Sequence, residues 1–167
     1  MSTFVENLSY MIQRIQTIFL FLVILLGVAA FFFPIMSFTA EGLTYTMNLY
    51  NTIVGDDISK ILSDNVGVGV MQAIVQLVAL AAILLFKNRS LQIKIGKLII
   101  LLIAFQIAAI VMYSDIIKSL MDISPDYVLV SFEFGAVLPV ISLICAYLAV
   151  FFIRKDDKLV RSADRLR

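Results

Sequence analysis

Four long apolar segments constrain the fold of this 167-residue chain more than any other feature. They run over about 15–36, 66–86, 98–117 and 134–153 and, apart from Asp115 near the end of the third, contain no charged residue. A helix needs about 20 apolar residues to cross a bilayer. With 62% apolar and 15% charged residues, the chain is also more apolar than soluble domains, which average about 45–50% and about 25%. We therefore predict an all-α membrane protein, a four-transmembrane-helix bundle that forms a single domain over residues 1–167.

The distribution of charge predicts which side of the membrane each loop occupies. Eleven of the thirteen Lys and Arg residues lie in the N-terminal tail, the 87–97 loop and the 154–167 tail. The remaining two lie in the 37–65 and 114–133 loops, which also hold eight acidic residues. Basic residues that flank spans are retained in the cytoplasm. We therefore predict a multi-pass protein with both termini cytoplasmic and the two acidic loops outside.

The two outer loops contain strand-like patterns. Residues 43–49 alternate between polar and apolar side chains after a turn at 41–42, which is typical of a half-buried strand. Residues 127–132 are rich in strand-forming types, and we expect them to pair with 43–49. The first and third loops are thus predicted to form a small extracytoplasmic β-sheet cap of two or three strands. Residues 56–62 are expected to form a short helix. This cap either closes the bundle or binds a ligand or partner.

Three glutamines are the notable polar groups expected within the membrane. Gln72 and Gln76 lie one turn apart in the second segment, and Gln106 lies in the third. Counted from the cytoplasmic ends of their segments, Gln76 and Gln106 lie at similar depth, which predicts a hydrogen bond between them. Such bonds contribute about 0.6 kcal/mol on average. These amides either join helices or line a polar substrate site, and the absence of an ionisable group beside them favours packing.

The C-terminal tail, IRKDDKLVRSADRLR, is basic and amphipathic if it is helical. Such segments lie on anionic lipid headgroups, dock on a protein, or remain solvated. The residues expected to carry docking to lipid or a partner are Lys158, Leu159, Arg161, Asp164, Arg165 and Leu166.

The composition excludes several kinds of chemistry. The chain has no His and a single Cys, Cys145, so a catalytic Ser-His-Asp triad, a His-bearing zinc site and an intramolecular disulfide are ruled out. It contains no Gly-rich phosphate loop and no EF-hand spacing. We predict no catalytic, cofactor-binding or metal site and no cofactor. The net charge of +1 indicates no nucleic-acid partner.

Four stretches carry a resemblance to a known family. They are MIQRIQTIFL (Met11 to Leu20), SFTAEGLTYTMNLY (Ser37 to Tyr50), FEFGAVLPV (Phe132 to Val140) and RKDDKLVRSADRLR (Arg154 to Arg167). Over residues 11–167 the chain resembles an uncharacterised four-span inner-membrane family of Bacteroidetes-type bacteria. The resemblance implies four spans and the bacterial inner (cytoplasmic) membrane. Because that family is a domain of unknown function, the resemblance implies no activity.

The sequence leaves three functions open. The first is a non-enzymatic tetraspan protein that acts as an accessory, assembly or scaffolding subunit, with membrane lipids and a protein partner or second copy as its partners. The second is a small oligomeric transporter or channel built around Gln72, Gln76 and Gln106. The third is a membrane-embedded enzyme that acts on a lipid substrate through Asp126 and Glu133. The lack of charge within the spans favours the first.

Overall fold

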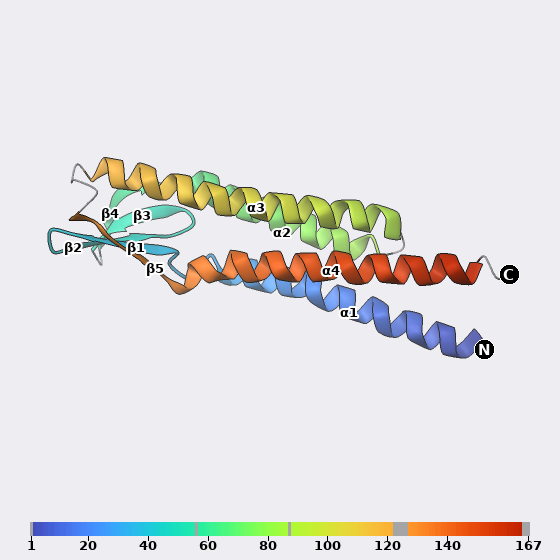
Figure 1. Ribbon diagram of the computed structural model, residues 1–167. Coiled ribbons are helices and arrows are strands. Elements are labelled where there is room, and N and C mark those ends of the chain that lie inside the picture. Colours follow the sequence, from blue (N-terminus) through green and yellow to red (C-terminus); the bar gives the residue numbers. More distant parts are fainter. Residues whose placement is uncertain (1, 56, 87, 122–126, 165–167) are drawn as a thin grey trace.

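The fold is a bundle of four helices with an antiparallel sheet at one end (Figure 1). The computed structural model describes residues 2–55, 57–86, 88–121 and 127–164, and their side chains except at 2–14, 57–59, 160, 161, 163 and 164. The helices are α1 (Ser2–Ala29), α2 (Val66–Leu84), α3 (Arg89–Leu120) and α4 (Phe134–Asp164). The strands are β1 (Met36–Ala40), β2 (Leu43–Met47), β3 (Asn51–Val54), β4 (Asp57–Asp64) and β5 (Leu129–Phe132). The predicted combination of a helical fold with a small sheet is confirmed.

The helices present apolar side chains outward. Three of them are long and apolar enough to cross a membrane, namely α2, α3 and the Phe134–Leu159 part of α4, and α1 contains a shorter apolar helix over Ile15–Ala29. Along α1, exposed apolar side chains recur every three or four residues, at Ile18, Phe21, Leu25 and Val28. A helix in water exposes polar residues instead. These helices therefore indicate a membrane protein.

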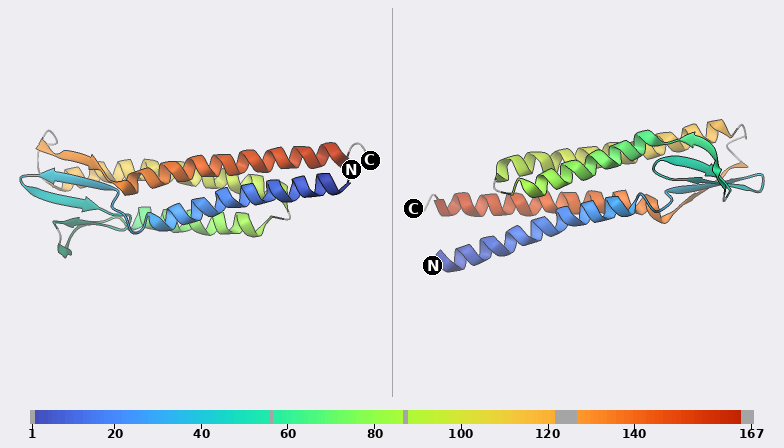
Figure 2. Two further views of the ribbon diagram at one scale, coloured as in Figure 1. Left: turned by 90° about the horizontal axis from the view of Figure 1, so that it is seen from below. Right: turned by 180° about the vertical axis from the view of Figure 1, so that it is seen from behind.

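Each helix packs antiparallel against two neighbours, and α1 against α4 closes the ring (Figure 2). The rings of Phe19 and Phe152 stack between α1 and α4 with their centroids 5.5 Å apart. Between α3 and α4 the Val150 side chain packs directly against Gly96, where an ideal Cβ would lie 2.5 Å from Val150 Cγ2. Consequently α1 begins and α4 ends at the same end of the bundle, away from the sheet (Figures 1 and 2).

The sheet has the strand order β4-β3-β2-β1-β5 and joins two distant segments of the chain. Strands β1 to β4 lie between α1 and α2, and β5 lies between α3 and α4, so the first and third loops do share one sheet. The predicted pairing of 127–132 with 43–49 is wrong, because β5 pairs with β1, with Val130 opposite Phe38. Backbone hydrogen bonds explain this placement. The Glu133 N–H donates to Ile35 O at 2.9 Å, which holds the end of β5 beside β1.

The expected helix over 56–62 is also wrong. Residues Asp57–Asp64 form strand β4, which pairs with β3, and residue 56 lies outside the described part. The buried Asn65 explains why this segment stays at the sheet, since its Nδ2 donates to Thr52 Oγ1 at 2.8 Å. Pairing with a neighbouring strand overrides the local preference for a helix.

The helix boundaries also differ from the predicted segments. Helix α3 begins at Arg89, so most of the predicted 87–97 loop is helical, and Asn88 caps it by accepting from the Leu91 N–H at 3.4 Å. It continues to Leu120 beside the sheet (Figure 1). Helix α1 ends at Ala29 rather than near residue 36. The early start of α3 arises because hydropathy marks only the apolar residues, whereas Lys, Gln and Arg also favour a helix.

Two apolar cores stabilise these elements. One lies between the sheet and the helices and includes Phe38, Met47, Ile117 and Leu138. The other lies within the bundle and includes Leu20, Val23, Val75, Ala79, Ile99 and Ile103. The sheet is therefore fixed to the bundle by its buried face as well as by its connections.

Candidate functional site

A central polar layer lies inside the bundle, formed by Gln72 and Gln76 of α2, Gln106 of α3 and Ser142 of α4. Gln106 Nε2 donates a hydrogen bond to Gln72 Oε1, and both side chains are buried. The predicted hydrogen bond between Gln76 and Gln106 is therefore wrong, because Gln106 bonds to Gln72 instead. Because α3 begins at Arg89 rather than near residue 98, Gln106 lies farther from the α2–α3 connection than predicted and is level with Gln72.

Gln76 instead faces a glycine of α1. An ideal Cβ at Gly27 would lie 1.6 Å from Gln76 Nε2 and 2.2 Å from Gln72 Nε2, so α1 and α2 touch at this position. Both side-chain polar atoms of Gln76 are buried and have no hydrogen-bond partner within the described residues, and the same holds for Ser142 Oγ. Amides and a hydroxyl form hydrogen bonds but do not titrate near neutral pH, so this layer can bind polar groups but cannot supply an acid or base.

A buried ion pair, which was not predicted from the sequence, lies at the end of the bundle away from the sheet. Arg89 Nη2 of α3 lies 3.3 Å from Asp156 Oδ2 of α4, with 20% of the Arg89 side chain exposed and 2% of the Asp156 side chain. The apolar pattern alone places Arg89 in a loop and Asp156 in the tail. A signal was present, because Ala149, Ile153 and Asp156 recur at i, i+4 and i+7, the spacing of one buried helix face.

Two buried glutamines accompany this ion pair. Gln92 lies one turn along α3 from Arg89, and its Nε2 donates to Ala82 O of α2 at 3.1 Å. Gln16 of α1 is buried and lies one turn before Phe19. Phe19 stacks on Phe152 of α4, which lies one turn before Asp156. All four helices therefore place a polar group near this end of the bundle. The ion pair links α3 to α4 and the Gln92 hydrogen bond links α3 to α2.

The predicted docking residues of the tail that the structure describes lie apart from the central polar layer. Helix α4 continues through the tail as far as Asp164, and Lys158 and Leu159 are exposed on it. The side chains of Arg161 and Asp164 lie outside the described part, as do residues Arg165 and Leu166. The structure thus shows a helical tail but brings none of its described side chains to the central polar layer.

The two loop carboxylates considered for lipid chemistry are not brought together in the described part of the chain. Asp126 lies outside it. Glu133 Oε1 accepts a hydrogen bond from Ser37 Oγ at 2.8 Å and so links the start of α4 to β1. This contact gives Glu133 a structural role at the junction of the helices and the sheet.

Comparison with known proteins gives the family but no activity. The chain matches the family described as Domain of unknown function (DUF4293) over residues 12–166. None of the curated proteins compared with the chain matches it. The match confirms the resemblance to an uncharacterised family. Since it covers nearly the whole sequence, the chain belongs to the DUF4293 family.

Proposed function

We propose that this protein is a four-span inner-membrane protein that serves as a non-enzymatic accessory, assembly or scaffolding subunit of a membrane complex. The observation that carries this proposal is that the helices touch one another inside the bundle. The Gln72–Gln106 hydrogen bond joins α2 to α3, and Gly27 brings α1 against α2. At Gly96, α3 also meets α4 closely. Such contacts favour a rigid bundle that presents its outer surfaces to partners.

The packing of α1 supports a fourth span. Its 28 residues extend about 42 Å at about 1.5 Å per residue, which exceeds the hydrocarbon thickness of about 30 Å. It lies antiparallel beside α4, which is long and apolar enough to cross, and the Phe19–Phe152 stack fixes their register. Two helices packed in this way pass through the same layer.

The charge distribution supports the proposed orientation. Exposed Arg154, Lys155 and Lys158 lie at the bundle end away from the sheet, whereas exposed Glu41 and Asp64 lie in the sheet. Basic residues near span ends remain in the cytoplasm. The sheet therefore lies outside the cytoplasm, and both termini lie inside.

The chemistry of the bundle supports a non-enzymatic role. The central polar layer contains neutral groups, and the charges of Arg89 and Asp156 are paired with each other. General acid–base catalysis needs a titratable group that can reach a substrate. These side chains instead contact other helices of the same bundle.

A small oligomeric transporter is the second candidate. Gln76 favours it, because its buried amide has no hydrogen-bond partner within the described residues. Contacts at Gly27 and Gly96 close the interior of a single bundle. A pathway lined by the polar layer would therefore require association of copies to separate the helices of each bundle.

Affinity purification in mild detergent with quantitative mass spectrometry separates these functions. We expect the tagged wild type to retain a partner in stoichiometric amount, and reciprocal tagging of that partner to recover this chain. A matched variant scrambles residues 158–167 at constant composition and helical amphipathicity. It should insert normally and lose the partner. A clean homo-oligomer would favour the transporter, and full retention by the scrambled tail would refute docking through the tail.

A further inference from the structure

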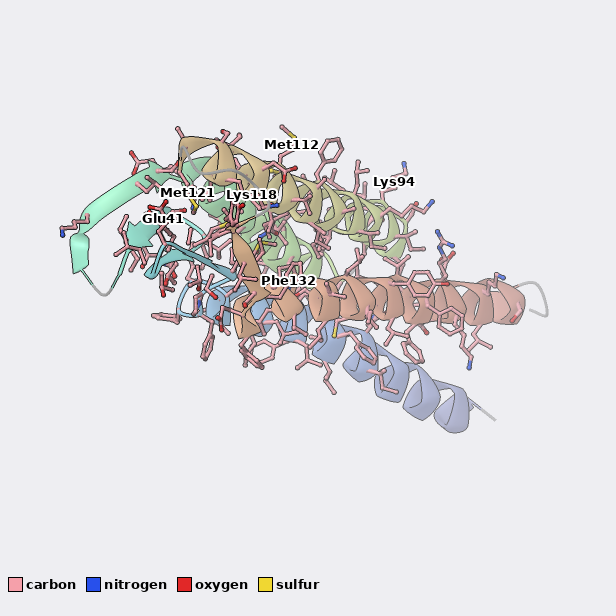
Figure 3. The ribbon with its side chains drawn as sticks, turned by 60° about the vertical axis from the view of Figure 1, so that its left-hand side comes forward. Glu41, Lys94, Met112, Lys118, Met121 and Phe132 are labelled. Atoms are coloured by element: carbon pink, nitrogen blue, oxygen red, sulfur yellow. The ribbon has the colours of Figure 1, made fainter. Side chains whose placement is uncertain are left out.

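Four exposed phenylalanines surround the junction of the bundle with the sheet on the α1–α4 side. This phenylalanine collar consists of Phe32 and Phe33 after α1, Phe132 at the end of β5 and Phe134 at the start of α4. Their exposed fractions are 79%, 42%, 73% and 60%. The rings of Phe33 and Phe134 meet edge to face with centroids 5.2 Å apart, which joins the two chain segments. Figure 3 shows Phe132 where β5 meets α4.

The collar continues the outward apolar surface of the helices. On α1, exposed Leu25 and Val28 lead at helical spacing to Phe32. On α4, exposed Val137 and Ile141 continue in the same way from the first residue of the helix. Because these stripes face lipid in the proposed four-span arrangement, the collar is the place where the lipid-facing surface reaches the sheet.

Beyond the collar, an apolar surface without charges extends along the β5 edge of the sheet. Strand β5 is an edge strand, and Leu129 and Phe132 are each 73% exposed. Residues 127–132 contain no charge. The opposite edge, β4, carries exposed Lys60 and Asp64 and has an irregular register with β3. Charges and irregular pairing are typical of an edge that faces water.

The outer part of α3 exposes charged groups among apolar ones such as Ile116 and Leu120. There Lys118 Nζ lies 3.2 Å from Asp115 Oδ1, and Ser119 is exposed nearby. Figure 3 places Lys118 close to the sheet. The two sides of the junction thus differ in charge, since α3 carries an exposed ion pair there and β5 carries exposed aromatic and apolar side chains without a charge.

We propose that the phenylalanine collar and β5 rest in the outer leaflet of the bilayer, with lipid as the occupant of this edge of the sheet. The inference rests on the proposed four-span arrangement. Unpaired backbone groups on the free side of β5 are costly in hydrocarbon, so the strand lies in the headgroup layer. The rings of Phe132 and Phe134 reach toward the acyl chains, as aromatic residues at membrane interfaces do. The β5 edge of the sheet is therefore the edge that contacts the membrane surface.

Single-tryptophan fluorescence tests this placement, because the sequence contains no Trp. The variants are Phe132→Trp and Leu129→Trp, with Ile144→Trp in α4 as the span control and Leu43→Trp in the β1–β2 hairpin as the water control. Each is reconstituted into phosphatidylcholine vesicles, with acyl chains brominated near the headgroup as one quencher. Iodide on both sides of the membrane is the second quencher, so the orientation of the protein does not affect the result.

We expect brominated lipid to quench Phe132→Trp, and iodide to quench both β5 variants about threefold less steeply than Leu43→Trp, as interfacial burial predicts. If brominated lipid quenches Ile144→Trp while both β5 variants show the same quenching as Leu43→Trp, the inference is overturned and the four-span arrangement is retained. Protection of both β5 variants from both quenchers would overturn it in favour of a second copy of the chain on this edge. Failure of brominated lipid to quench Ile144→Trp would overturn the four-span arrangement and the inference with it.

Discussion

Arg89 at the start of α3 and Asp156 near the end of α4 form an ion pair with 3.3 Å between Nη2 and Oδ2. The Asp156 carboxylate is almost completely buried, and the guanidinium is largely so. The pair joins α3 to α4 at the end of the bundle that the sheet does not hold together. Removing one member leaves the other charge buried without its partner, which destabilises a protein more than the intact pair stabilises it.

We expect Asp156→Asn and Arg89→Gln each to lower the free energy of unfolding by about 2 kcal/mol. This is below the ~3–5 kcal/mol of a fully buried pair, because a fifth of the Arg89 side chain remains exposed. Unfolding in mixed micelles of increasing SDS content measures the loss. The exposed Arg154→Gln is the control and should change little. Equal losses for Arg154→Gln and Arg89→Gln would show that the ion pair has no special role.

The amide pair predicts a specific coupling. Gln72→Leu and Gln106→Leu should each reduce stability, and the double variant should cost less than the sum by about 0.5–1.5 kcal/mol. The same cycle with Gln76→Leu and Gln106→Leu is the control and should be additive, since the structure joins Gln106 to Gln72. Coupling in the control cycle alone would reverse the assignment.

The contact at Gly27 predicts a defect with a rescue. A Cβ there would overlap the amide of Gln76, so Gly27→Ala should cost about 1–3 kcal/mol, as overpacking does. Shortening the opposing side chain with Gln76→Ala should recover part of the loss in the double variant. Thermal unfolding in detergent compares the three proteins. A double variant that loses the full sum of both changes would place the two residues apart.

Much of the fold follows from local features of the sequence. The turn between β1 and β2 is an example, because Gly42 adopts a positive φ angle of 78°, which Gly accommodates at no steric cost. The apolar segments likewise indicate α2, α3 and α4, because long apolar runs are stable as helices in a membrane.

The remaining features depend on contacts between distant residues. Strand β5 chooses β1 because backbone hydrogen bonds at Ile35 and Pro34 hold the start of α4 beside it, and no local pattern encodes that choice. The burial of Asp156 could not be predicted, because the composition of the tail does not show that Asp156 lies on the side of α4 that packs against α3. Gln106 bonds to Gln72 rather than to Gln76, because the start of α3 at Arg89 sets how α2 and α3 align along their length.

Four crossings with the sheet outside the cytoplasm are tested most directly by thiol labelling of single-cysteine variants. The background is Cys145→Ala, which removes the buried native thiol. Lys60→Cys reports the sheet, Ser2→Cys the start of α1 and Arg161→Cys the tail. A membrane-impermeant maleimide is applied to cells with a permeable outer envelope, before and after the inner membrane is opened.

We predict that Lys60→Cys reacts in unopened cells, whereas Ser2→Cys and Arg161→Cys react only after the inner membrane is opened. This pattern requires α1 to cross the membrane and requires an odd number of crossings among α2, α3 and α4. Reaction of Ser2→Cys together with Lys60→Cys in unopened cells would show that α1 does not cross. The reverse pattern, with both terminal positions reactive and Lys60→Cys protected, would contradict the orientation.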